Sequence, residues 1–395
     1  MIMIKLCWAP MTDFYSSKEI NLDIFSDLCN QSVLPGDYPV ATAVESNVII
    51  YQRDALYEAL IDENRKRLVQ RELHNCLRHG PGVFVIRNFY NNNRIVDEST
   101  NIFRQIIDEE QAGNENTGDH FANAGENERI WNSFQKVCER NPQSFIEYYK
   151  NPLYTLVSES WLGPGYQMSA QVNVVKPGGK AQAAHRDYHL GFQSEKVIQR
   201  FPLPLQVASQ YLTLQGAIAH TDMPPQTGPT MLLPFSQQYE LGYLAWRNLS
   251  FKDFFSNHAV QLRLNKGDAI FFSPALFHAA GQNTSSKDRI ANLLQISVAF
   301  GKPMESINRY RMMKLTYPHL LEKMNQQSIS DIEIMTIVDI IADNYSFPTN
   351  LDLVPPVNGL APETARQMMI RAVGQRLSVE QFQVEVNKHA SDRRA

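Results

Sequence analysis

Short runs of apolar residues, each bounded by turn residues, fill the middle of this chain. From Gln167 to Val175 polar and apolar residues alternate, which is the pattern of a strand with two different faces. The pairs Gly228-Pro229 and Gly267-Asp268 mark turns between later runs. Many short strands separated in this way are typical of β-sandwiches and jelly rolls. The predicted strands of this region cover residues 167–175, 211–219, 230–233, 261–264, 269–272 and 290–300.

Helical spacing of apolar residues precedes the strand-rich region. Leucines spaced for one face of a helix or its neighbour predict a helix over residues 53–78, which the sequence Gly80-Pro81-Gly82 ends. Residues 111–129 are rich in Asn, Gly and Glu, so we predict a long polar loop there, and such loops are often functional. Further predicted elements are helices over residues 95–110 and 142–162 and strands over residues 83–86 and 130–137.

Helical patterns return after the strand-rich region. The residues expected to be helical are 312–324, 330–342 and 363–373. Ser378 followed by Gln381 predicts a capping box at the start of a last helix. The apolar faces of these tail helices are expected to pack structurally, and a homodimer contact is the alternative use for them.

The order of these elements predicts the fold class. We expect a mainly β fold with helices, in which a double-stranded β-helix (jelly roll) core is buttressed by helices and followed by a helical C-terminal extension. The expected organisation is an N-terminal extension over residues 1–55, a jelly-roll domain over residues 56–305 and a helical extension over residues 306–395. We find no internal repeat and no low-complexity tract.

Composition and charge exclude several classes of protein. The 395 residues are 43% hydrophobic and carry a formal net charge of -4, which is ordinary for a globular chain and predicts no nucleic-acid or anionic-membrane partner. The four cysteines are widely and irregularly spaced, so no disulfide framework is expected and a reducing, cytoplasmic location fits best. We expect no leader peptide and no membrane span, because no apolar stretch is long enough.

Three residues are candidate metal ligands. His185 and Asp187 stand two positions apart, and residues two apart on a strand face the same side. His278 ends a later turn-and-strand segment, and distant strands can be neighbours in a jelly roll. Two imidazoles and one carboxylate form the facial triad of non-haem Fe(II) oxygenases. Zinc binds the same ligand types, and an isolated His-x-Asp triplet is most often a surface feature.

Arg289 is a candidate anion-binding residue. It opens the long strand that follows His278. An arginine beside a metal site can bind a carboxylate through two parallel hydrogen bonds. The alternative is an exposed salt bridge at the rim of the fold.

These motifs resemble the phytanoyl-CoA dioxygenase family of Fe(II)/2-oxoglutarate oxygenases. The resemblance covers roughly residues 60–305, and its most specific part is the distal motif. The matching positions are Leu162-Gly163-Pro164, His185-x-Asp187-Tyr188-His189, Gly228 to Ser236, and Gly267-Asp268 through His278, Gly281 and Asn283 to Arg289.

The resemblance implies a cofactor and roles for individual residues. His185, Asp187 and His278 would hold Fe(II), and Arg289 would bind the distal carboxylate of 2-oxoglutarate, with O₂ as the other co-substrate. Counting without gaps from Leu162-Gly163-Pro164 places Val172 against 2-oxoglutarate, and Asn283 belongs to the same cofactor motif.

Other polar residues near these motifs are candidates for substrate binding. Tyr188, His189 and His220 are expected to reach the substrate, and the alternative is that they pack against or cap the end of a strand. Because Val172 is placed inward, the polar residues that alternate with it, among them Gln171 and Asn173, are expected to face solvent.

Two departures from the family pattern leave the pocket shape open. Ala217 stands where many family members carry tryptophan, and Phe235 stands where many carry glycine. The presence of Asp187 is informative, because related halogenating oxygenases lack this carboxylate. The resemblance therefore implies hydroxylation rather than halogenation.

The resulting hypothesis is an Fe(II)- and 2-oxoglutarate-dependent dioxygenase. It would hydroxylate an unactivated C–H bond of a small natural-product-like or amino-acid-like molecule and release succinate and CO₂. The sequence shows no clear basic patch for a CoA handle, although an acyl-CoA hydroxylase is a second candidate. A metal-dependent cupin that needs no 2-oxoglutarate is a third candidate, in which Arg289 has no role. A catalytically silent jelly-roll binding protein is a fourth, and the intact motif argues against it.

Overall fold

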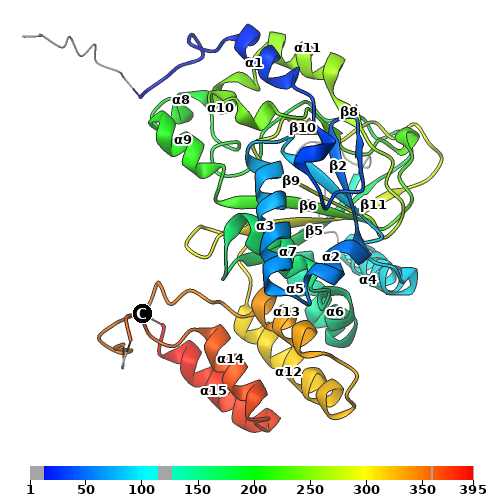
Figure 1. The fold of residues 1–395 in the computed structure, drawn as a ribbon. Coiled ribbons are helices and arrows are strands. Elements are labelled where there is room, and N and C mark those ends of the chain that lie inside the picture. Colours follow the sequence, from blue (N-terminus) through cyan, green and yellow to red (C-terminus); the bar gives the residue numbers. More distant parts are fainter. Residues whose placement is uncertain (1–12, 114–126, 357–358, 395) are drawn as a thin grey trace, which may run out of the picture.

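A computed structural model describes residues 13–113, 127–356 and 359–394. Within these residues the strands form an eight-stranded main sheet in the order β1-β2-β3-β9-β6-β11-β5-β4 and a three-stranded minor sheet in the order β10-β7-β8 (Figure 1). In that order the main-sheet strands cover Ala43–Glu45, Val48–Gln52, Val83–Arg87, Ala269–Phe272, Thr213–Ala219, Arg289–Ser297, Gln167–Val175 and Asn127–Ile130. The minor-sheet strands cover His278–Ala279, Met231–Leu232 and Val260–Gln261.

The longest pairing in the main sheet joins β5 and β11. These strands run antiparallel with Arg289 opposite Val175 and Ser297 opposite Gln167. The neighbouring pair β6 and β11 is also antiparallel, whereas β2 and β3 are parallel. Both β1 and β2 come from the N-terminal segment, so this segment contributes to the main sheet. The register aligns every second residue of β5, β11 and β6 on one face of the sheet.

The two faces of the main sheet pack against different parts of the chain. On the outer face, Val172 and Val174 of β5 join the large hydrophobic core that the sheet shares with the helices. On the inner face, Ala217 of β6 and Ile270 of β9 pack in a smaller core with Leu264 near the minor sheet. Complete burial of one aliphatic side chain contributes about 1.5–3 kcal/mol, so the outer core is a large source of stability.

Helices cover the outer face and form the C-terminal end of the molecule. In Figure 1 the helices α12 to α15 lie at one end, and α12 contacts α5 and α6. The helices before β5 are α1 (Leu22–Cys29), α2 (Arg53–Ala59), α3 (Glu63–Arg78), α4 (Asn93–Ala112), α5 (Ser133–Arg140), α6 (Pro142–Tyr149) and α7 (Leu153–Leu162). Those after β5 are α8 (Glu195–Ile198), α9 (Leu203–Ser209), α10 (Gly242–Ala245), α11 (Leu249–His258), α12 (Arg309–Asn325), α13 (Asp331–Ile341), α14 (Ala365–Gly374) and α15 (Val379–Ser391).

Most of the predicted elements are confirmed. The strands over residues 167–175 and 269–272 form with the predicted bounds, and the capping box of Ser378 and Gln381 begins α15. The strand predicted over residues 130–137 is wrong, because its second half is the helix α5, whose buried residues Phe134, Val137 and Cys138 follow helical spacing. Most of the predicted loop over residues 111–129 lies outside the described residues.

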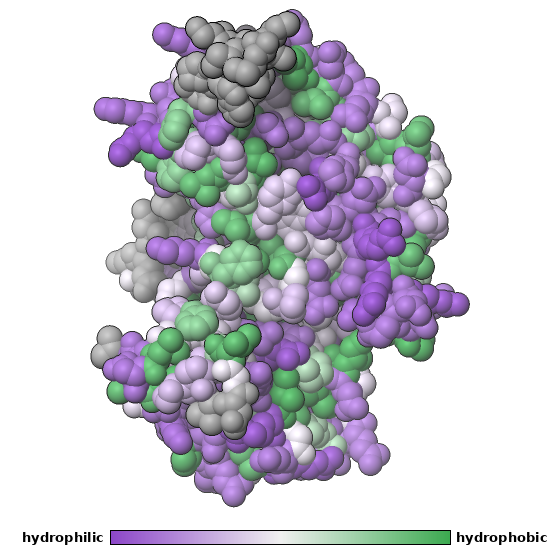
Figure 2. All heavy atoms as spheres, turned by 60° about the vertical axis from the view of Figure 1, so that its left-hand side comes forward, coloured by the Kyte–Doolittle hydropathy of each residue, from purple (hydrophilic) through white to green (hydrophobic). Residues whose placement is uncertain are grey.

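The prediction of a mainly β fold is wrong in its proportions. Of the described residues, 44% are helical and 15% lie in strands, because helices cover one face of the large main sheet and continue through the C-terminal extension. The architecture is therefore mixed α/β. Among the described residues no helix combines the length and the apolar character that a membrane span requires. On the face shown in Figure 2, polar side chains predominate and apolar ones form small, separated groups.

Candidate metal centre

Two histidines and one aspartate converge at one end of the space beside the inner face of the main sheet. One potential ligand atom each from His185, Asp187 and His278 lies within 4.8 Å of the others. Nε2 of His185 lies 3.5 Å from Oδ1 of Asp187, and Nε2 of His278 lies 3.3 Å from Oδ2. The three ligand atoms predicted from the sequence are therefore brought together.

The backbone holds the two histidines side by side. The N–H of His185 donates to the carbonyl of His278 at 3.0 Å, and the N–H of His278 donates to the carbonyl of His185 at 3.2 Å. This is a single antiparallel β-bridge rather than the strand predicted for residues 185–187. Asp187 follows directly in a loop, with its N–H donating to the carbonyl of Pro274.

Backbone carbonyls determine the tautomer of both imidazoles. Nδ1 of His185 lies 2.9 Å from the carbonyl oxygen of Ala183, and Nδ1 of His278 lies 2.8 Å from that of Leu276. A carbonyl oxygen only accepts hydrogen bonds, so each Nδ1 carries the proton. Each Nε2 then faces the other ligands and is the ring nitrogen that gives its lone pair to a bound metal, as metal-binding histidines require.

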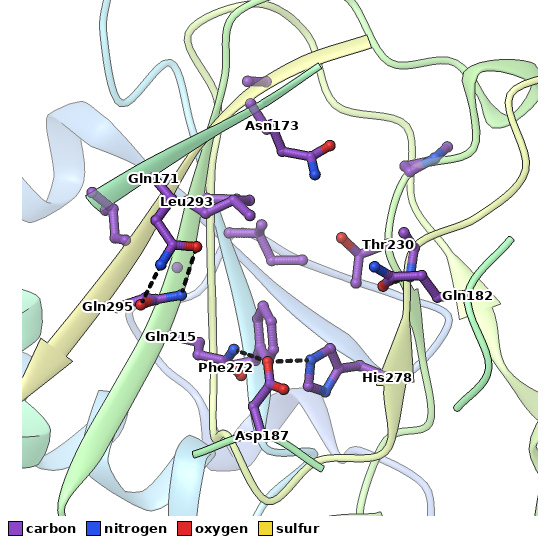
Figure 3. Close-up of a pocket in the computed structure, with 18 of the residues that line it drawn as sticks. Gln171, Asn173, Gln182, Asp187, Gln215, Thr230, Phe272, His278, Leu293 and Gln295 are labelled. Carbon is purple, nitrogen blue, oxygen red and sulfur yellow. Dashed lines mark hydrogen bonds and ion pairs between the residues drawn. The ribbon is translucent and has the colours of Figure 1, made fainter. Parts of the chain in front are cut away.

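Gln215 orients the carboxylate. Its Nε2 donates to Oδ2 of Asp187 at 2.5 Å (Figure 3). Burial by itself raises the pKa of Asp187, but the positive charge that His185 and His278 carry when Nε2 is also protonated, the hydrogen bond from His278 and the amide of Gln215 outweigh burial and hold this pKa well below its usual range. Asp187 is therefore an ionised carboxylate, which is the form that binds a metal.

Arg186 anchors the segment between the two ligands. Its side chain is almost completely buried and donates from Nη2 to the carbonyls of Ser236 and Tyr239, at 2.6 and 2.9 Å. Its guanidinium also lies over the rings of Phe277 and Tyr243. Burial lowers the pKa of Arg186 to about 10, which leaves it cationic at neutral pH. Successive side chains of an extended segment point in opposite directions, so His185 and Asp187 point toward the metal centre and Arg186 points away from it into the protein interior.

A cavity of about 140 Å³ opens beside the three ligands. In Figure 3, Asp187 and His278 lie at one end, Gln171 and Gln295 line one side, and Thr230 and Gln182 line the opposite side. Alternate residues of β5, β6, β9 and β11 form its floor. The apolar members of this floor include Ala217, Ala219, Ile270, Phe272, Ala291 and Leu293.

Arg289 lines the same cavity and has no anionic partner among the described residues. It is only 7% exposed, and its Nη1 is buried with no hydrogen-bond partner. Burial lowers the pKa of Arg289 to about 10, so the side chain remains charged at neutral pH. Leaving a buried cation unpaired costs several kcal/mol. An unpaired arginine in a cavity is therefore a site for a carboxylate ligand.

Two of the predicted cofactor contacts are wrong. Val172 packs among the helices on the outer face of the sheet and does not line the cavity. The prediction failed because the gapless count is wrong by one residue, and a shift of one residue along a strand moves a side chain to the opposite face of the sheet. Asn283 is fully buried and uses its amide on the backbone, donating to the carbonyls of Val175 and Lys287 and accepting from Ser285. Asn283 therefore stabilises the turn before β11.

The predicted substrate contacts do not line the cavity either. His220 is on the helical side, where Nδ1 pairs with the hydroxyl of Thr100 at 2.8 Å and Nε2 with that of Tyr148 at 2.7 Å. Both ring nitrogens are used, so the substrate role predicted for His220 is wrong. Tyr188 and His189 adopt left-handed backbone conformations, with φ of 61° and 42°, and turn the chain after Asp187.

The polar residues of β5 and β11 are the functional residues that the sequence analysis missed. Gln171 and Asn173 line the cavity and are buried, so the prediction that they face solvent is wrong. Gln295 and Gln215 join them from β11 and β6. Glutamine or asparagine at alternate positions of strands in the middle of a chain was the available signal, because buried polar residues need a partner.

The site fits Fe(II) and 2-oxoglutarate. Two neutral imidazole nitrogens and one carboxylate match the ligand types and number of a facial triad, which leaves other coordination positions for a bidentate ligand and O₂. The unpaired Nη1 of Arg289 lies in the same cavity and matches a second carboxylate on that ligand.

Comparisons with known proteins give the family. The model of the phytanoyl-CoA dioxygenase (PhyH) family matches residues 78–291. An uncharacterized protein of Saccharomyces cerevisiae, YJR154W, is 27% identical over 140 residues, which cover 35% of this chain and 37% of that protein. The dioxygenase cdmD of Talaromyces verruculosus is 28% identical over 144 residues, which cover 36% of this chain and 43% of that protein. The matched stretch thus spans less than half of either relative.

The matching solved structures have low TM-scores and low sequence identity. The epimerase SnoN, in complex with Fe³⁺, alpha-ketoglutarate and nogalamycin RO, has a TM-score of 0.42 and 13% identity over 59% of this chain and 85% of that chain. HygX from Streptomyces hygroscopicus, with nickel and 2-oxoglutarate bound, has a TM-score of 0.39 and 12% identity over 57% of this chain and 86% of that chain. Because the family model covers more than half of the sequence and the metal triad is intact, the chain belongs to the phytanoyl-CoA dioxygenase family of Fe(II)- and 2-oxoglutarate-dependent enzymes.

Proposed function

We propose that this protein hydroxylates an unactivated C–H bond of a small organic molecule. The reaction consumes the substrate, 2-oxoglutarate and O₂ and yields the hydroxylated product, succinate and CO₂. The observation that carries this proposal is the placement of the three ligands and the unpaired Arg289 around one cavity. A metal-dependent cupin that needs no 2-oxoglutarate would give Arg289 no partner.

Some residues of the site would bind the metal and 2-oxoglutarate, and others would hold those ligands in position. His185, Asp187 and His278 would hold Fe(II), and Arg289 would bind the far carboxylate of 2-oxoglutarate. When bound, the iron and 2-oxoglutarate supply the oxidising chemistry, in which decarboxylation of the keto acid activates O₂. Gln215 and the carbonyls of residues 183 and 276 keep the ligands in one orientation, so that the metal geometry is defined before substrate binds.

The carboxylate of Asp187 favours hydroxylation over halogenation. A halogenating enzyme needs a metal position for the halide, and this position is free where the carboxylate is absent. Here Asp187 lies between the two imidazoles and is ionised. It therefore occupies the third protein position of the triad.

The substrate is expected to be natural-product-like or amino-acid-like rather than an acyl-CoA. The lining of the cavity combines apolar side chains with carboxamides, which suits a small molecule of mixed polarity. An acyl-CoA hydroxylase is the second candidate, and it needs a cationic surface for the CoA phosphates. The residues that line the cavity offer two arginines, Arg129 and Arg289, and we assign the second to 2-oxoglutarate.

We also infer how the domain is organised. The two sheets would form the double-stranded β-helix of the family over residues 56–305, with β1 and β2 of the N-terminal extension added to the edge of the main sheet. Residues 306–395 would form the helical extension. A homodimer contact through these helices and a cytoplasmic location stay predictions.

The function is tested by turnover of 2-oxoglutarate. Purified protein supplied with Fe(II), 2-oxoglutarate and O₂ should form succinate, and a metabolite extract should contain a product 16 mass units heavier than its substrate. His278→Ala should abolish both signals, because it removes a ligand. His79→Ala, which changes an exposed histidine at the C-terminal end of helix α3 that does not line the cavity, should leave succinate formation unchanged. Undiminished turnover in His278→Ala would refute the assignment.

A further inference from the structure

Two buried glutamines form a reciprocal amide pair on one wall of the cavity. Nε2 of Gln171 donates to Oε1 of Gln295 at 3.3 Å, and Nε2 of Gln295 donates to Oε1 of Gln171 at 3.4 Å (Figure 3). Gln171 is completely buried and Gln295 is 8% exposed. Both residues line the cavity that holds the metal ligands.

Neighbouring side chains determine the orientation of Gln171. Nη1 of Arg129 donates to Oε1 of Gln171 at 2.8 Å, and Nε2 of Gln171 also donates to Oε1 of Glu305 at 3.3 Å. An arginine only donates and an ionised carboxylate only accepts, so the oxygen and the nitrogen of the Gln171 amide cannot exchange places. With Gln295, these partners use both donors and both acceptor positions of Gln171.

Within the part of the chain that the structure describes, Gln295 keeps unused hydrogen-bonding capacity. Its amide has two N–H groups and two acceptor positions, and the pair with Gln171 uses one of each. Because Gln171 is held in one orientation, the Gln295 amide is held as well. Gln295 therefore presents one unused N–H donor and one unused carbonyl acceptor in fixed positions, on a side chain that lines the cavity and is more than nine-tenths buried.

The register of the sheet places this amide next to the metal ligands. Gln295 of β11 is directly opposite Gln215 of β6, and Gln215 donates to Asp187. Cross-strand partners on one face have Cβ atoms about 4.5–5.5 Å apart. A group bound by Gln295 therefore lies beside the ligand set, on the part of the floor away from Arg289 at the other end of β11.

The charges around the cavity restrict what this amide can bind. Among the described residues that line it, Asp187 is the one carboxylate, and its oxygens face the imidazoles and Gln215. Glu305 contacts Gln171 but does not line the cavity, whereas two cations, Arg129 and Arg289, do line it. A substrate ammonium group would find no counter-ion there and would have to leave water for a buried site, which is costly. A neutral group suits the unused donor and acceptor.

We propose that Gln295 is a specificity-determining residue that selects a substrate with a neutral, hydrogen-bonding group beside the oxidised carbon, such as an amide or a hydroxyl, over one with an amine. This inference rests on the proposed function, because it concerns the substrate of the same site. It narrows the natural-product-like or amino-acid-like class to molecules that carry an amide or a hydroxyl, rather than a free amine, beside the reacting carbon. Gln171 and Arg129 act as positioning residues that hold Gln295.

The test uses binding beside the metal rather than turnover. Protein loaded with Co(II) in place of iron and with 2-oxoglutarate is titrated with piperidin-2-one, a neutral lactam, with cyclohexanol, and with piperidine, the matching amine. Perturbation of the Co(II) absorption reports binding beside the ligands. The lactam or the alcohol should bind at least about tenfold more tightly than piperidine, because a mispaired buried polar group costs about a factor of ten or more. Tighter binding of the lactam than of the alcohol identifies the group as an amide, and the reverse identifies it as a hydroxyl.

Three variants separate recognition from structural support. Gln295→Met should weaken the preferred neutral probe about tenfold, and Gln295→Glu should reverse the preference toward piperidine, because it adds a counter-ion. Gln206→Met removes a buried glutamine of α9, which donates to the carbonyls of Ile198 and Phe201, and should keep the preference of the unchanged protein. Thermal melting of each variant identifies any loss of folding. If Gln295→Met does not fold, Gln295→Glu still tests the inference, because glutamate has nearly the same shape as glutamine.

Two outcomes would overturn the inference and are distinct from failure of the proposed function. Equal affinity for the neutral probes and piperidine would remove the basis for charge selection. An unchanged preference in Gln295→Glu would show that Gln295 does not contact the ligand. If the unchanged protein does not bind Co(II) and 2-oxoglutarate at all, the proposed function itself fails.

Discussion

Gln215 donates a hydrogen bond from Nε2 to Oδ2 of Asp187 at 2.5 Å, and this bond connects the floor of the main sheet to the metal ligands. Asp187 lies in a loop after a single β-bridge, so its backbone is not held in the ladder of a sheet. Gln215 lies within the central strand β6. A rigid strand thus supplies the orientation that the loop lacks, as partners of metal ligands commonly do.

Replacement of Gln215 should weaken metal binding without removing a ligand. We expect Gln215→Leu to lower the affinity for Fe(II) or Co(II) about 10–100-fold, because the carboxylate loses its partner. Metal titration followed by absorption or calorimetry measures the change. Gln199→Leu, in which the lost hydrogen bond joins Gln199 to Glu195 in helix α8 away from the cavity, serves as the control. Equal metal affinities in Gln215→Leu and Gln199→Leu would contradict the role assigned to Gln215.

Replacement of Arg289 should act on 2-oxoglutarate and spare the metal. Arg289→Met removes a buried charge that would bind a carboxylate, and hydrogen bonds to charged groups contribute about 1.5–3 kcal/mol each. We therefore expect the dissociation constant of 2-oxoglutarate to rise roughly 10–100-fold while the affinity for Co(II) is retained. Calorimetric titration of 2-oxoglutarate into the Co(II) protein measures this. Arg104→Met on the exposed side of α4 is the control, and a 2-oxoglutarate affinity that Arg289→Met leaves intact would refute the assignment.

His220 should affect stability in acid rather than catalysis. Burial, together with the nearby charge of Lys266, lowers the pKa of His220 to about 3 in the folded protein, whereas an unfolded histidine titrates near 6.5. Between these values the unfolded chain binds the proton and the folded chain does not, so this group makes the protein less stable as the pH falls from about 6.5 toward 3.

The corresponding variant is His220→Gln, which does not titrate. Its free energy of unfolding should decline less steeply with falling pH over this range, by up to about 1.4 kcal/mol per pH unit. At neutral pH it should be less stable by about 1–3 kcal/mol, because Thr100 and Tyr148 lose their well-placed partner. Urea unfolding at several pH values measures both effects, with exposed His79→Gln as the control. A pH slope identical to that of the unchanged protein would count against this account.

A methyl group at Gly242 should disturb the anchor of the metal-binding segment. A Cβ built at Gly242 would lie 1.8 Å from Cζ of Arg186, which is held by carbonyls and aromatic rings. We expect Gly242→Ala to cost roughly 1–3 kcal/mol of stability, as overpacking of a core does, and to weaken metal binding by displacing Arg186. Gly374→Ala in α14 meets nothing within 4 Å and should be neutral or stabilising by up to about 1 kcal/mol. Thermal melting compares the two, and an unchanged melting temperature in Gly242→Ala would show that Arg186 can move freely.

The metal ligands could be predicted from the sequence, whereas the pair of glutamine amides could not. His185, Asp187, His278 and Arg289 were found because their residue types are rare in such strands and their spacing matches a family motif. Gln171 and Gln295 belong to no such motif, and they are brought together by the pairing of β5 with β11. Glu305 joins them from the loop that leads to the C-terminal helices, and sequence spacing gives no sign of that contact.

Local patterns were enough to predict most strands and helices, the residue types of the metal triad and the arginine that accompanies it, because period-two alternation, capping and ligand chemistry are properties of neighbouring residues. The folded chain alone decided which face of β5 looks into the cavity. Alternation shows that a strand has two faces, but both faces of β5 are buried, one against helices and one against a polar cavity. The apolar face, including Val172, therefore packs against the helices. The polar face, which would point to solvent in an exposed strand, lines the cavity through Gln171 and Asn173.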